Sequence, residues 1–353
     1  MKVVVAIDSF KGCLTSVEAN AAARAGILDA YPNAEVLEIP VSDGGEGWLD
    51  AFRAAIGGEM VSVRAYDPLL RPIDSCYLRK DDMAVIETAR VIGLTLLQDE
   101  ERNPLQATTY GVGQIIADAI RQGCRRFVIG LGGSATSDVG KGMLQALSEM
   151  LGEGEDVEKI PLLKTLQFTI ATDVKNPLYG PDGAAHVFAM QKGATTEMID
   201  ELDQQAMAFA KQSATRCGYD NALLPGAGAA GGLGYAFMQY LHAECRSGID
   251  LLLDAVRFEE QLKGADFVVT GEGQADAQTL MGKLPQGIMK RALKLGVPTF
   301  LIAGKVVDRQ QLLDGGFAGV ECIHPPTISF EEAMQKDLTI EHIRELMGKG
   351  GVF

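Results

Sequence analysis

The stretch ADFVVTGEGQADAQTLMGK, from Ala265 to Lys283, decides the fold that we predict for this chain. It begins with a short apolar run, Phe267 to Thr270, which is rich in β-branched residues and too brief for a buried helix, so it predicts a strand buried on both faces. The run stops at Gly271-Glu272-Gly273, and a helical pattern from Leu280 to Leu293 follows. A strand, a glycine turn with acids and then a helix place polar groups at the carboxyl edge of a parallel sheet, where ligands bind.

The totals of the sequence limit the classes of protein to consider. The 353 residues suffice for two domains, and the formal net charge of -15 argues against nucleic acid or an anionic membrane as a partner. No segment reaches the roughly 18 apolar residues of a membrane span. The six cysteines lie far apart without a CxxC pair, which predicts thiols in a reducing cytoplasm, with disulfides as the alternative.

The N-terminal part predicts two units of strand, polar loop and helix. Lys2 to Ile7 is a buried strand pattern that runs directly into Asp8-Ser9-Phe10-Lys11-Gly12. Glu35 to Ile39 is a second strand pattern, followed by the loop from Ser42 to Gly47 and a short helix. Both polar loops therefore follow strands at the same expected edge.

From Val61 the pattern changes to short strands at the spacing of antiparallel pairing. The later elements are predicted as strands at 127–129, 166–171, 299–302 and 318–323, and as helices at 113–121, 142–150, 195–214 and 340–347, with another helix opening in the glycine-rich segment 226–234.

The count of strand–helix units predicts an α/β fold with one interruption. The simplest packing is a five-stranded parallel sheet formed by residues 1–60 and 256–353, with an α+β domain of residues 61–255 inserted in it. If the strand order is 2-1-3-4-5, as in flavodoxin-like sheets, the switch point lies between the first and third strands. Their ends carry Asp8 and Glu272, so we expect these two distant loops to meet.

The standard nucleotide signatures are absent. Each Gly-Lys pair lacks the other parts of a Walker A loop, and protein-kinase, zinc and GxSxG motifs do not occur. Gly226 to Gly231 matches GxGxxG but follows Leu224-Pro225 rather than a clear strand. It is either a dinucleotide loop or, as we favour, a place where a helix end packs tightly or bare backbone approaches a ligand.

The segment GLGGSATSD, Gly130 to Asp138, predicts an anion site. Its small residues let backbone amides face an oxyanion, its hydroxyl groups can donate hydrogen bonds, and the following helix adds its positive end. A structural turn with a helix cap is the alternative.

Four loops carry acids directly after predicted strands: Asp8, Asp43 with Glu46, Asp173, and Glu272 with Asp276. Each alone could be a cap or turn residue, but four beside glycines favour magnesium held by carboxylates and phosphate oxygens. The nearby cations are Lys11, Lys192 and Lys283, which are either merely solvated or directed at an anionic ligand. These residue types suit phosphoryl transfer, in which a protein mainly positions and neutralises the reacting groups.

Seven motifs together closely resemble the class I glycerate kinase family of bacteria. They are AIDSFKG, PVSDGGEG, GLGGSATSD, ATDVKNPLYGPDGAA, QKGA, GAGAAGGLG and VVTGEGQADAQT with the later GK, and they cover nearly the whole chain in the family's order. The chain departs from the family pattern at Ile7 and Met190, where proline is common, and at Gln274, where arginine is frequent.

The resemblance implies ATP-dependent phosphorylation of D-glycerate with Mg²⁺ in a cleft between two domains. It implies 2-phosphoglycerate as the favoured product, with 3-phosphoglycerate as the alternative, and an inserted domain similar to restriction endonucleases. The expected partners are these small molecules, with neither nucleic acid nor membrane, in a cytoplasmic monomer or homodimer.

Site roles are carried over onto matching positions as expectations. The catalytic residues are Asp173, Asp8 and Lys11, the substrate-binding residues are Ser9, Lys11, Asn176 and Lys192, the nucleotide-binding or phosphate-binding residues are Gly132, Gly133, Ser134, Thr136, Gly228, Gly231 and Lys283, and the metal ligands are Asp43, Glu272 and Asp276.

Two other classes of function remain open from the sequence. An NAD-dependent oxidoreductase that uses the GAGAAG loop predicts a strand before Gly226 and binding of NADH. A non-catalytic glycerate-binding protein predicts binding without release of ADP. GLGGSAT also faintly resembles the phosphate loop of GHMP small-molecule kinases, but the rest of that family's order is missing.

Overall fold

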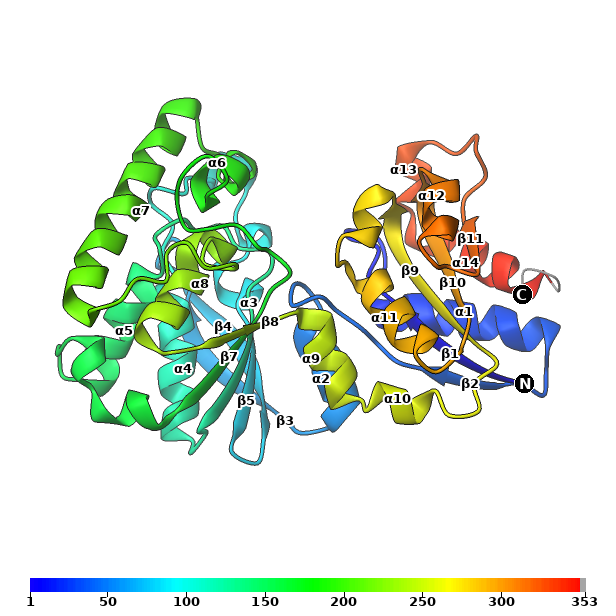
Figure 1. Cartoon of the computed structure of the whole chain (residues 1–353), viewed down its shortest axis with the longest axis horizontal. Coiled ribbons are helices and arrows are strands. Elements are labelled where there is room, and N and C mark those ends of the chain that lie inside the picture. Colours follow the sequence, from blue (N-terminus) through cyan, green and yellow to red (C-terminus); the bar gives the residue numbers. More distant parts are fainter. Residues whose placement is uncertain (350–353) are drawn as a thin grey trace. The chain divides into compact units, whose positions relative to one another are not determined.

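The computed structural model describes residues 1–349 and divides the chain into two compact units. Unit 1 comprises Met1–Asp43, Asp50–Ile56 and Ile249–Phe353, and unit 2 comprises Gly44–Leu49 and Gly57–Gly248. The segments of unit 1 are blue and yellow to red in Figure 1, and those of unit 2 are mostly cyan to green. The domains expected from sequence were 1–60 with 256–353, and 61–255. The two divisions differ at Gly44–Leu49, which the expectation placed in the first domain and the structure groups with unit 2.

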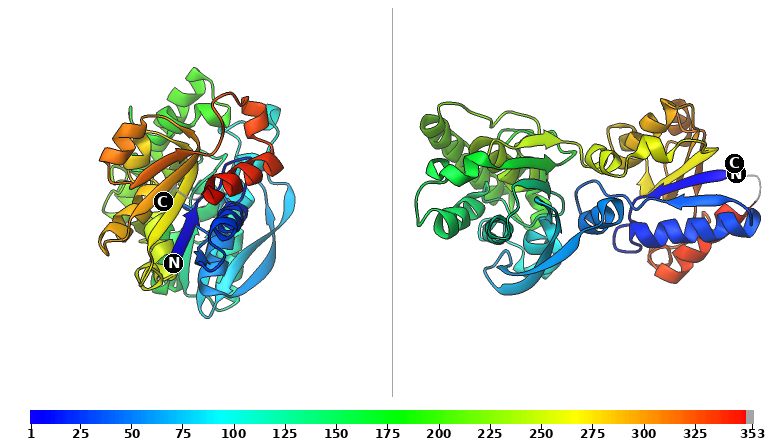
Figure 2. Two further views of the ribbon diagram at one scale, coloured as in Figure 1. Left: turned by 90° about the vertical axis from the view of Figure 1, so that its right-hand side faces the viewer. Right: turned by 90° about the horizontal axis from the view of Figure 1, so that it is seen from below.

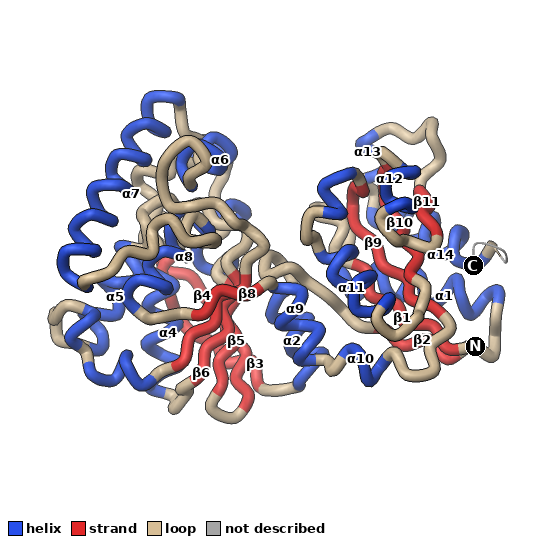
Figure 3. The backbone as a smooth tube through the Cα atoms, viewed as in Figure 1, coloured by secondary structure: helices blue, strands red, loops and turns tan. Residues whose placement is uncertain are grey.

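Unit 1 contains a five-stranded parallel sheet in the order β11-β10-β9-β1-β2. Counted along this sheet's own strands, the order is the predicted 2-1-3-4-5, with β1 and β9 as neighbours. The interior strand β1, between β9 and β2, is apolar and fully buried from Val3 to Ile7 because helices cover both faces. The strands are β1 (Lys2–Ile7), β2 (Glu35–Glu38), β9 (Phe267–Ala275), β10 (Thr299–Val306) and β11 (Gly319–Cys322), red in Figure 3.

Two apolar clusters fill the two faces of this sheet. One joins alternate β1 residues to α1 and α14, and the other joins β10 to α11 and α12. In Figure 2 the ribbons of α1 and α14, blue and red, lie on one side of this sheet, and the yellow to orange helices lie on the other. Helix α1 begins with a capping box between Thr15 and Glu18, and Gly26 lets the backbone of α14 approach closely. The helices are α1 (Ser16–Ala30), α2 (Trp48–Ile56), α9 (Gly248–Ala255), α10 (Phe258–Gln261), α11 (Leu284–Leu293), α12 (Arg309–Asp314), α13 (Phe330–Ala333) and α14 (Lys336–Gly348), with the 3₁₀ turn η6 (Ala277–Leu280).

The glycine turn predicted at Gly271-Glu272-Gly273 is wrong. Strand β9 continues through these residues to Ala275, paired in parallel with β10, which is itself longer than expected. A Cβ at Gly304 would lie 2.7 Å from the Gly273 carbonyl oxygen, so small residues permit the close pairing. The helix then begins at Leu284, because the segment around Leu280 forms η6 instead.

Unit 2 contains a six-stranded mixed sheet in the order β3-β4-β5-β6-β7-β8. The predicted antiparallel pairing of the first three strands is confirmed, and β5 to β8 run parallel. The short strand β8 was not predicted, because three residues give no measurable periodicity. The strands are β3 (Glu59–Tyr66), β4 (Pro72–Lys80), β5 (Met83–Glu87), β6 (Arg126–Gly130), β7 (Gln167–Ala171) and β8 (Glu244–Arg246).

Helices cover the unit 2 sheet and enclose a core of aliphatic and aromatic side chains. Phe127 and Phe168 stack within it at 4.8 Å between ring centroids. Among residues 1–349, no helix combines the length and the apolar character that crossing a bilayer requires. The helices are α3 (Ala89–Ile92), α4 (Tyr110–Arg121), α5 (Lys141–Leu151), α6 (Ala184–Phe188), α7 (Thr196–Cys217) and α8 (Ala229–Tyr240), with short 3₁₀ turns at Leu94–Leu96, Asp99–Glu101, Val157–Lys159, Pro161–Thr165 and Met190–Lys192.

Candidate functional site

Asp8 directly follows β1, and Glu272 lies within the neighbouring strand β9, so the two acids are close to each other, as predicted. Ile7 pairs with Gly271, and the Asp8 amide donates a hydrogen bond of 2.9 Å to the Gly271 carbonyl oxygen. The Ser16 hydroxyl group donates to the Ile7 carbonyl oxygen at 2.5 Å and accepts from the Val41 amide at 2.9 Å. Ser16, which the sequence analysis did not select, thus ties the ends of β1 and β2 together behind the acidic loop.

The Asp8 carboxyl group is electrostatically strained. Burial raises its pKa to about 8, and repulsion from Asp43 and Glu272 adds to the effect, while the Ser9 amide and Lys11 oppose it. The Ser9 amide donates to the carboxylate at 2.7 Å. A carboxylate that resists ionisation among other acids is a group that a bound cation would stabilise.

Glu272 lies beside the same edge and has its own polar partners. Its Oε1 accepts a hydrogen bond of 2.5 Å from the Thr279 hydroxyl group, and its Oε2 lies 4.0 Å from Lys283 Nζ. Burial raises the pKa of this carboxyl group, and Thr279, Lys283 and Lys11 oppose the rise. Thr279 ends the quoted motif VVTGEGQADAQT, but the sequence assigned it no role, because its partner Glu272 is set by the fold.

Asp276 forms the cap of η6. One of its carboxylate oxygens accepts from the Gln278 amide at 2.8 Å, and the other accepts from Gln274 Nε2 at 3.1 Å. Asp276 therefore shapes the turn that carries Thr279 and Lys283. Gln274, which stands where the resemblance leads us to expect arginine, supports this cap.

The carboxylates of unit 1 do not form a complete set of metal ligands by themselves. Among residues 1–349, no three His, Cys, Asp or Glu side chains are grouped closely enough to hold a metal ion by themselves. Magnesium is commonly held by one or two carboxylates together with phosphate oxygens and water. The chemistry of the Asp8, Asp43 and Glu272 carboxylates fits that mode.

In unit 2, the loop Gly130–Asp138 follows β6 and is fixed by its own backbone. The Gly132 amide donates to the Gly44 carbonyl oxygen at 3.0 Å, and the Ala135 amide donates to the Ile92 carbonyl oxygen at 2.6 Å. Within the described chain, by contrast, the amides that donate to no protein acceptor include those of Gly133, Ser134, Thr136 and Ser137. Of the residues predicted to bind phosphate here, Gly132 therefore has its amide engaged within the protein, whereas Gly133, Ser134 and Thr136 do not.

Asp138 anchors the end of this loop. Its carboxylate accepts hydrogen bonds from the amides of Thr109, Gly140 and Gly142 at 2.8 to 3.0 Å, and from the Thr109 hydroxyl group at 2.9 Å. The intervening Val139 has a φ of 58°, which β-branched residues rarely adopt. Asp138 thus fixes the loop to the start of α5, a role that the sequence analysis did not assign.

Lys192 is placed differently from the expected solvated or substrate-facing lysine. Its side chain is 3% exposed, and Nζ donates to the Ser134 hydroxyl oxygen at 3.0 Å and to the Thr136 carbonyl oxygen at 2.7 Å. Burial lowers the pKa of this amino group to about 7, against a weak opposing effect of Asp138. The amino group therefore contacts the loop Gly130–Asp138 from inside unit 2.

The glycines of the GxGxxG match pack against neighbouring backbone. A Cβ at Gly228 would lie 2.3 Å from the Pro177 carbonyl oxygen, and one at Gly231 would lie 2.0 Å from the Thr136 carbonyl oxygen. Gly231 also has a φ of 65°, and its own carbonyl oxygen accepts from the Val139 amide at 3.1 Å. This is the tight packing that we favoured from sequence, and it supports the loop Gly130–Asp138 from behind.

Asp173 and Asn176 lie in the loop after β7, next to the loop Gly130–Asp138. Gly130 pairs with Ala171, so the carboxyl ends of β6 and β7 meet at one edge of the unit 2 sheet. Asp173 is exposed; burial raises the pKa of the Cys245 thiol, and the charge of Asp173 adds to this effect. Asn176 Nδ2 donates to the Asp182 carbonyl oxygen at 2.8 Å, so this amide group shapes its own loop.

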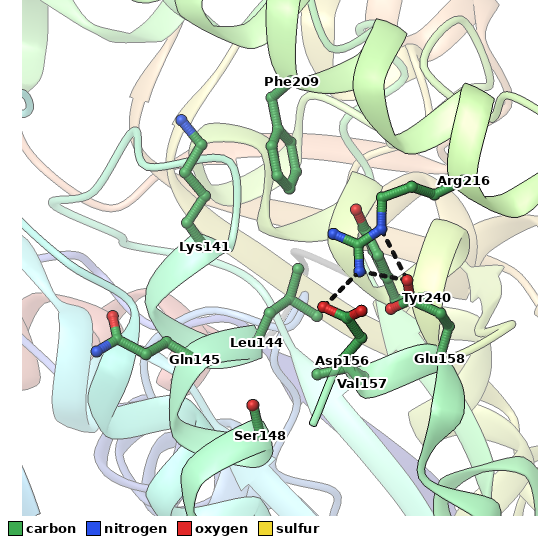
Figure 4. A pocket seen from close by; sticks show the side chains of 10 residues that line it. All are labelled: Lys141, Leu144, Gln145, Ser148, Asp156, Val157, Glu158, Phe209, Arg216 and Tyr240. Atoms are coloured by element: carbon green, nitrogen blue, oxygen red, sulfur yellow. Dashed lines mark hydrogen bonds and ion pairs between the residues drawn. The ribbon is translucent and has the colours of Figure 1, made fainter. Parts of the chain in front are cut away.

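A hollow of about 200 Å³ elsewhere in unit 2 contains none of the predicted site residues. In Figure 4 its wall carries Arg216, which forms ion pairs with Asp156 and Glu158. Lys141 Nζ lies 5.1 Å from the centroid of the Phe209 ring. Since its charges are paired or placed over a ring, this hollow offers no group suited to the predicted chemistry.

The structure gathers the predicted residues into two groups. In unit 1 the group at the ends of β1 and β9 contains Asp8, Ser9, Lys11, Asp43, Glu272 and Lys283, with Asp276 in the adjoining turn. In unit 2 the group at the ends of β6 and β7 contains Gly132, Gly133, Ser134, Thr136, Asp173, Asn176 and Lys192, with Gly228 and Gly231 packed behind.

Comparison with known proteins assigns the chain to a family. Residues 3–347 match the model of the glycerate kinase family. A glycerate kinase of Halalkalibacterium halodurans is 40% identical, covering 95% of this chain and 93% of the relative, and a glycerate 2-kinase of Escherichia coli is 38% identical, covering 87% and 86%. A crystal structure from Salmonella typhimurium LT2, provisionally named glycerate kinase 2, superposes with a TM-score of 0.81 at 34% identity over 99% of this chain and 96% of that one. The chain therefore belongs to the glycerate kinase family and is a kinase.

Proposed function

We propose that this enzyme transfers the terminal phosphoryl group of ATP to a hydroxyl group of D-glycerate with the help of Mg²⁺. We favour 2-phosphoglycerate as the product, with 3-phosphoglycerate as the alternative. The family match supports the kinase chemistry and the acceptor, and the name of the Escherichia coli relative, glycerate 2-kinase, supports the choice of product.

One observation carries the proposal: the two groups of residues have opposite electrostatic needs. The pKa of Asp8 is raised among other carboxylates, so that group would be stabilised by a cation. The pKa of Lys192 is lowered at a loop with available amides, so that loop would be stabilised by an anion. A magnesium-bound nucleotide supplies both charges in one ligand.

The roles in unit 1 follow from this need for a cation. Asp43 and Glu272 would hold Mg²⁺, which would neutralise charge on the phosphate oxygens when bound. Lys11, whose charge opposes the raised pKa of both Asp8 and Glu272, would bind the glycerate carboxylate with Ser9 beside it. Lys283, 4.0 Å from Glu272, would contact a phosphate group.

The proton of the attacking hydroxyl group would be accepted by Asp8 or Asp173. Asp8 is held by the Ser9 amide, and ionisation of its carboxyl group would be promoted by the positive charge that the site attracts. Asp173 lies exposed at the sheet edge that also carries the loop Gly130–Asp138. These two acids belong to different units. We therefore propose that the substrate binds, during catalysis, in a cleft between the flavodoxin-like domain and the inserted domain.

The two alternative functions are not favoured. The residues just before Gly226 form a turn rather than a strand, and Gly228 and Gly231 pack against Pro177 and Thr136. Neither feature fits a dinucleotide loop. A non-catalytic glycerate-binding protein is disfavoured because the curated relatives are named as kinases.

A coupled assay of ADP release with D-glycerate, followed by phosphorus NMR of the product, tests the proposal. We expect ADP release that requires D-glycerate, ATP and Mg²⁺, and one phosphoglycerate resonance that identifies the modified hydroxyl group. NADH binding without ADP release would instead support the oxidoreductase, and glycerate binding without ADP release would support the non-catalytic protein.

A further inference from the structure

Lys192 has a buried amino group without a carboxylate partner. Among residues 1–349 it forms no ion pair, and its Nζ contacts only the Ser134 hydroxyl group and the Thr136 carbonyl group. The single charged group that acts on it noticeably is Asp138. The Asp138 carboxylate already accepts hydrogen bonds from Thr109, Gly140 and Gly142, so it compensates Lys192 poorly. A buried ammonium group left in this state is costly.

The loop next to Lys192 contains further polar atoms without partners. Thr136 and Ser137 are buried, with 0% and 9% of their surface exposed. Their hydroxyl oxygens, Thr136 Oγ1 and Ser137 Oγ, make no hydrogen bond with the protein. Their amides donate to no protein acceptor either. These hydroxyl and amide groups are donors, and beside the Lys192 amino group they form a cluster suited to a ligand of negative charge.

We propose that Lys192 is a positioning residue that holds the segment Gly132–Ser137 open to an anion, and that an anion bound there supplies the charge that Lys192 lacks. The proposal rests on the proposed function only for the identity of that anion, the phosphate groups of Mg²⁺-bound ATP. Because its amino group lies inside unit 2, Lys192 acts through Ser134 and Thr136 rather than by touching the ligand.

This arrangement links anion binding to the uptake of a proton. Burial lowers the pKa of Lys192 to about 7, so the amino group exchanges its proton near neutral pH. A bound anion favours the charged form and raises the pKa. When the anion binds, the Lys192 amino group then takes up a proton from the buffer, at most one proton for each protein chain.

Isothermal titration of the full-length protein with Mg²⁺-bound ATP at pH 7.5, in two buffers of different ionisation enthalpy, measures this proton. We expect binding heats that differ between the buffers and correspond to the uptake of a substantial fraction of one proton. Lys192→Met and Lys192→Arg should remove the difference, because neither side chain titrates in this range. Lys141→Met is the matched control and should preserve it, since Lys141 is exposed at the start of α5.

The pH dependence of catalysis provides a second measurement. The value of kcat/KM for ATP should fall as the pH rises above about 7 in the wild type, because the free enzyme loses the Lys192 proton. In Lys192→Arg this fall should disappear. Lys192→Met should lower kcat/KM for ATP roughly 100-fold, with Lys192→Arg recovering part of the loss. A purely structural lysine would change the melting temperature of both variants but would leave the pH profile unchanged.

Equal wild-type heats in the two buffers, or an unchanged buffer dependence in Lys192→Met, would overturn the inference. If Mg²⁺-bound ATP gives no binding heat at all, the proposed function fails, and sodium sulfate then tests the loop by itself. Sulfate does not titrate near neutral pH, so stabilisation of the wild type but not of Lys192→Met, measured by thermal melting, would support the anion site. Equal stabilisation of both proteins would reject it.

Discussion

The carboxyl edge of the unit 1 sheet and the loop Gly130–Asp138 of unit 2 are built in contrasting ways. At the unit 1 edge, the acids crowd together, and burial and mutual repulsion raise the pKa of Asp8 to about 8. In unit 2, the loop is held by backbone pairing with Gly44 and Ile92 and by the buried Lys192. The first region contains carboxylates that repel one another, and the second contains hydroxyl and amide groups without hydrogen-bond acceptors.

The contrast shows that each region is incomplete with respect to a different charge. A cation would relieve the carboxylates, and an anion would relieve the lysine and the hydroxyl groups. Functional sites often retain such strain because the ligand, rather than the protein, satisfies it. Substitutions that relieve the strain should therefore stabilise the fold and reduce activity, which separates these positions from ordinary structural ones.

Asp8→Asn should have the largest effect. If Asp8 accepts the hydroxyl proton, kcat falls about 1000-fold in the coupled assay. The same change should raise the melting temperature at pH 8.5 by roughly 2–5 °C, because the amide removes a buried carboxylate that resists ionisation.

The sign of this stability change depends on pH. A carboxyl group whose pKa is higher in the folded than in the unfolded state lowers stability as the pH rises from about 4 towards 8. The melting-temperature gain of Asp8→Asn should therefore shrink at pH 5 and nearly vanish near pH 4. If Asp8→Asn is less stable than the wild type at pH 8.5, the ionised Asp8 carboxylate does not destabilise the fold and this prediction is wrong.

Gly231→Ala should break the support behind the loop Gly130–Asp138. The new Cβ would lie 2.0 Å from the Thr136 carbonyl oxygen, at a residue with φ of 65°. We expect a loss of roughly 3 kcal/mol in the free energy of unfolding. Gly273→Ala is the control for stability, because a Cβ there meets nothing within 4 Å. Similar denaturation midpoints for the two variants would contradict the packing role of Gly231.

Asp173→Asn separates the two candidate bases. If Asp173 is the base, kcat should fall about 100-fold or more, and Asp8→Asn should then retain most of its turnover. Since Asp173 is exposed, the melting temperature should change little. Near-normal turnover of Asp173→Asn would reject its role as the base and leave Asp8 as the candidate.

Lys11→Ala should have the smallest effect. An exposed lysine that binds the glycerate carboxylate contributes mainly to substrate affinity, so we expect KM for D-glycerate to rise about tenfold while kcat changes less than threefold. Lys164→Ala, at an exposed position of unit 2, is the matched control. An unchanged KM for glycerate would count against carboxylate binding by Lys11.

Several features of the site could be predicted because they depend on residue order and spacing. The run Phe267 to Thr270 predicted a strand, and counting strand–helix units predicted a five-stranded parallel sheet. The order that places Asp8 beside Glu272 followed only if that sheet is flavodoxin-like, and the structure has this order. The end of that strand could not be predicted in the same way. Gly271 and Gly273 usually indicate a turn, but pairing with β10 keeps them extended, and pairing depends on a segment about thirty residues later.

The roles of single polar residues were harder to predict than their positions. Asp276 and Asn176 belong to conspicuous motifs, yet their side chains form turns in the structure. Thr279 and Asp138 were passed over, although they hold Glu272 and the start of α5. A sequence shows which groups can donate or accept hydrogen bonds, but their partners are chosen by three-dimensional proximity.

The sequence by itself determined the alternation of strands and helices, the edge at which the polar loops lie, and the family to which the chain is similar. These depend on local apolar periodicity and on the handed connection of parallel strands, which act over short distances along the chain. Only the tertiary structure decided that Lys192 is buried against Ser134 and that Asp8 resists ionisation. The state of a charge depends on the solvent and the charges that surround it, and these come from segments far apart in sequence.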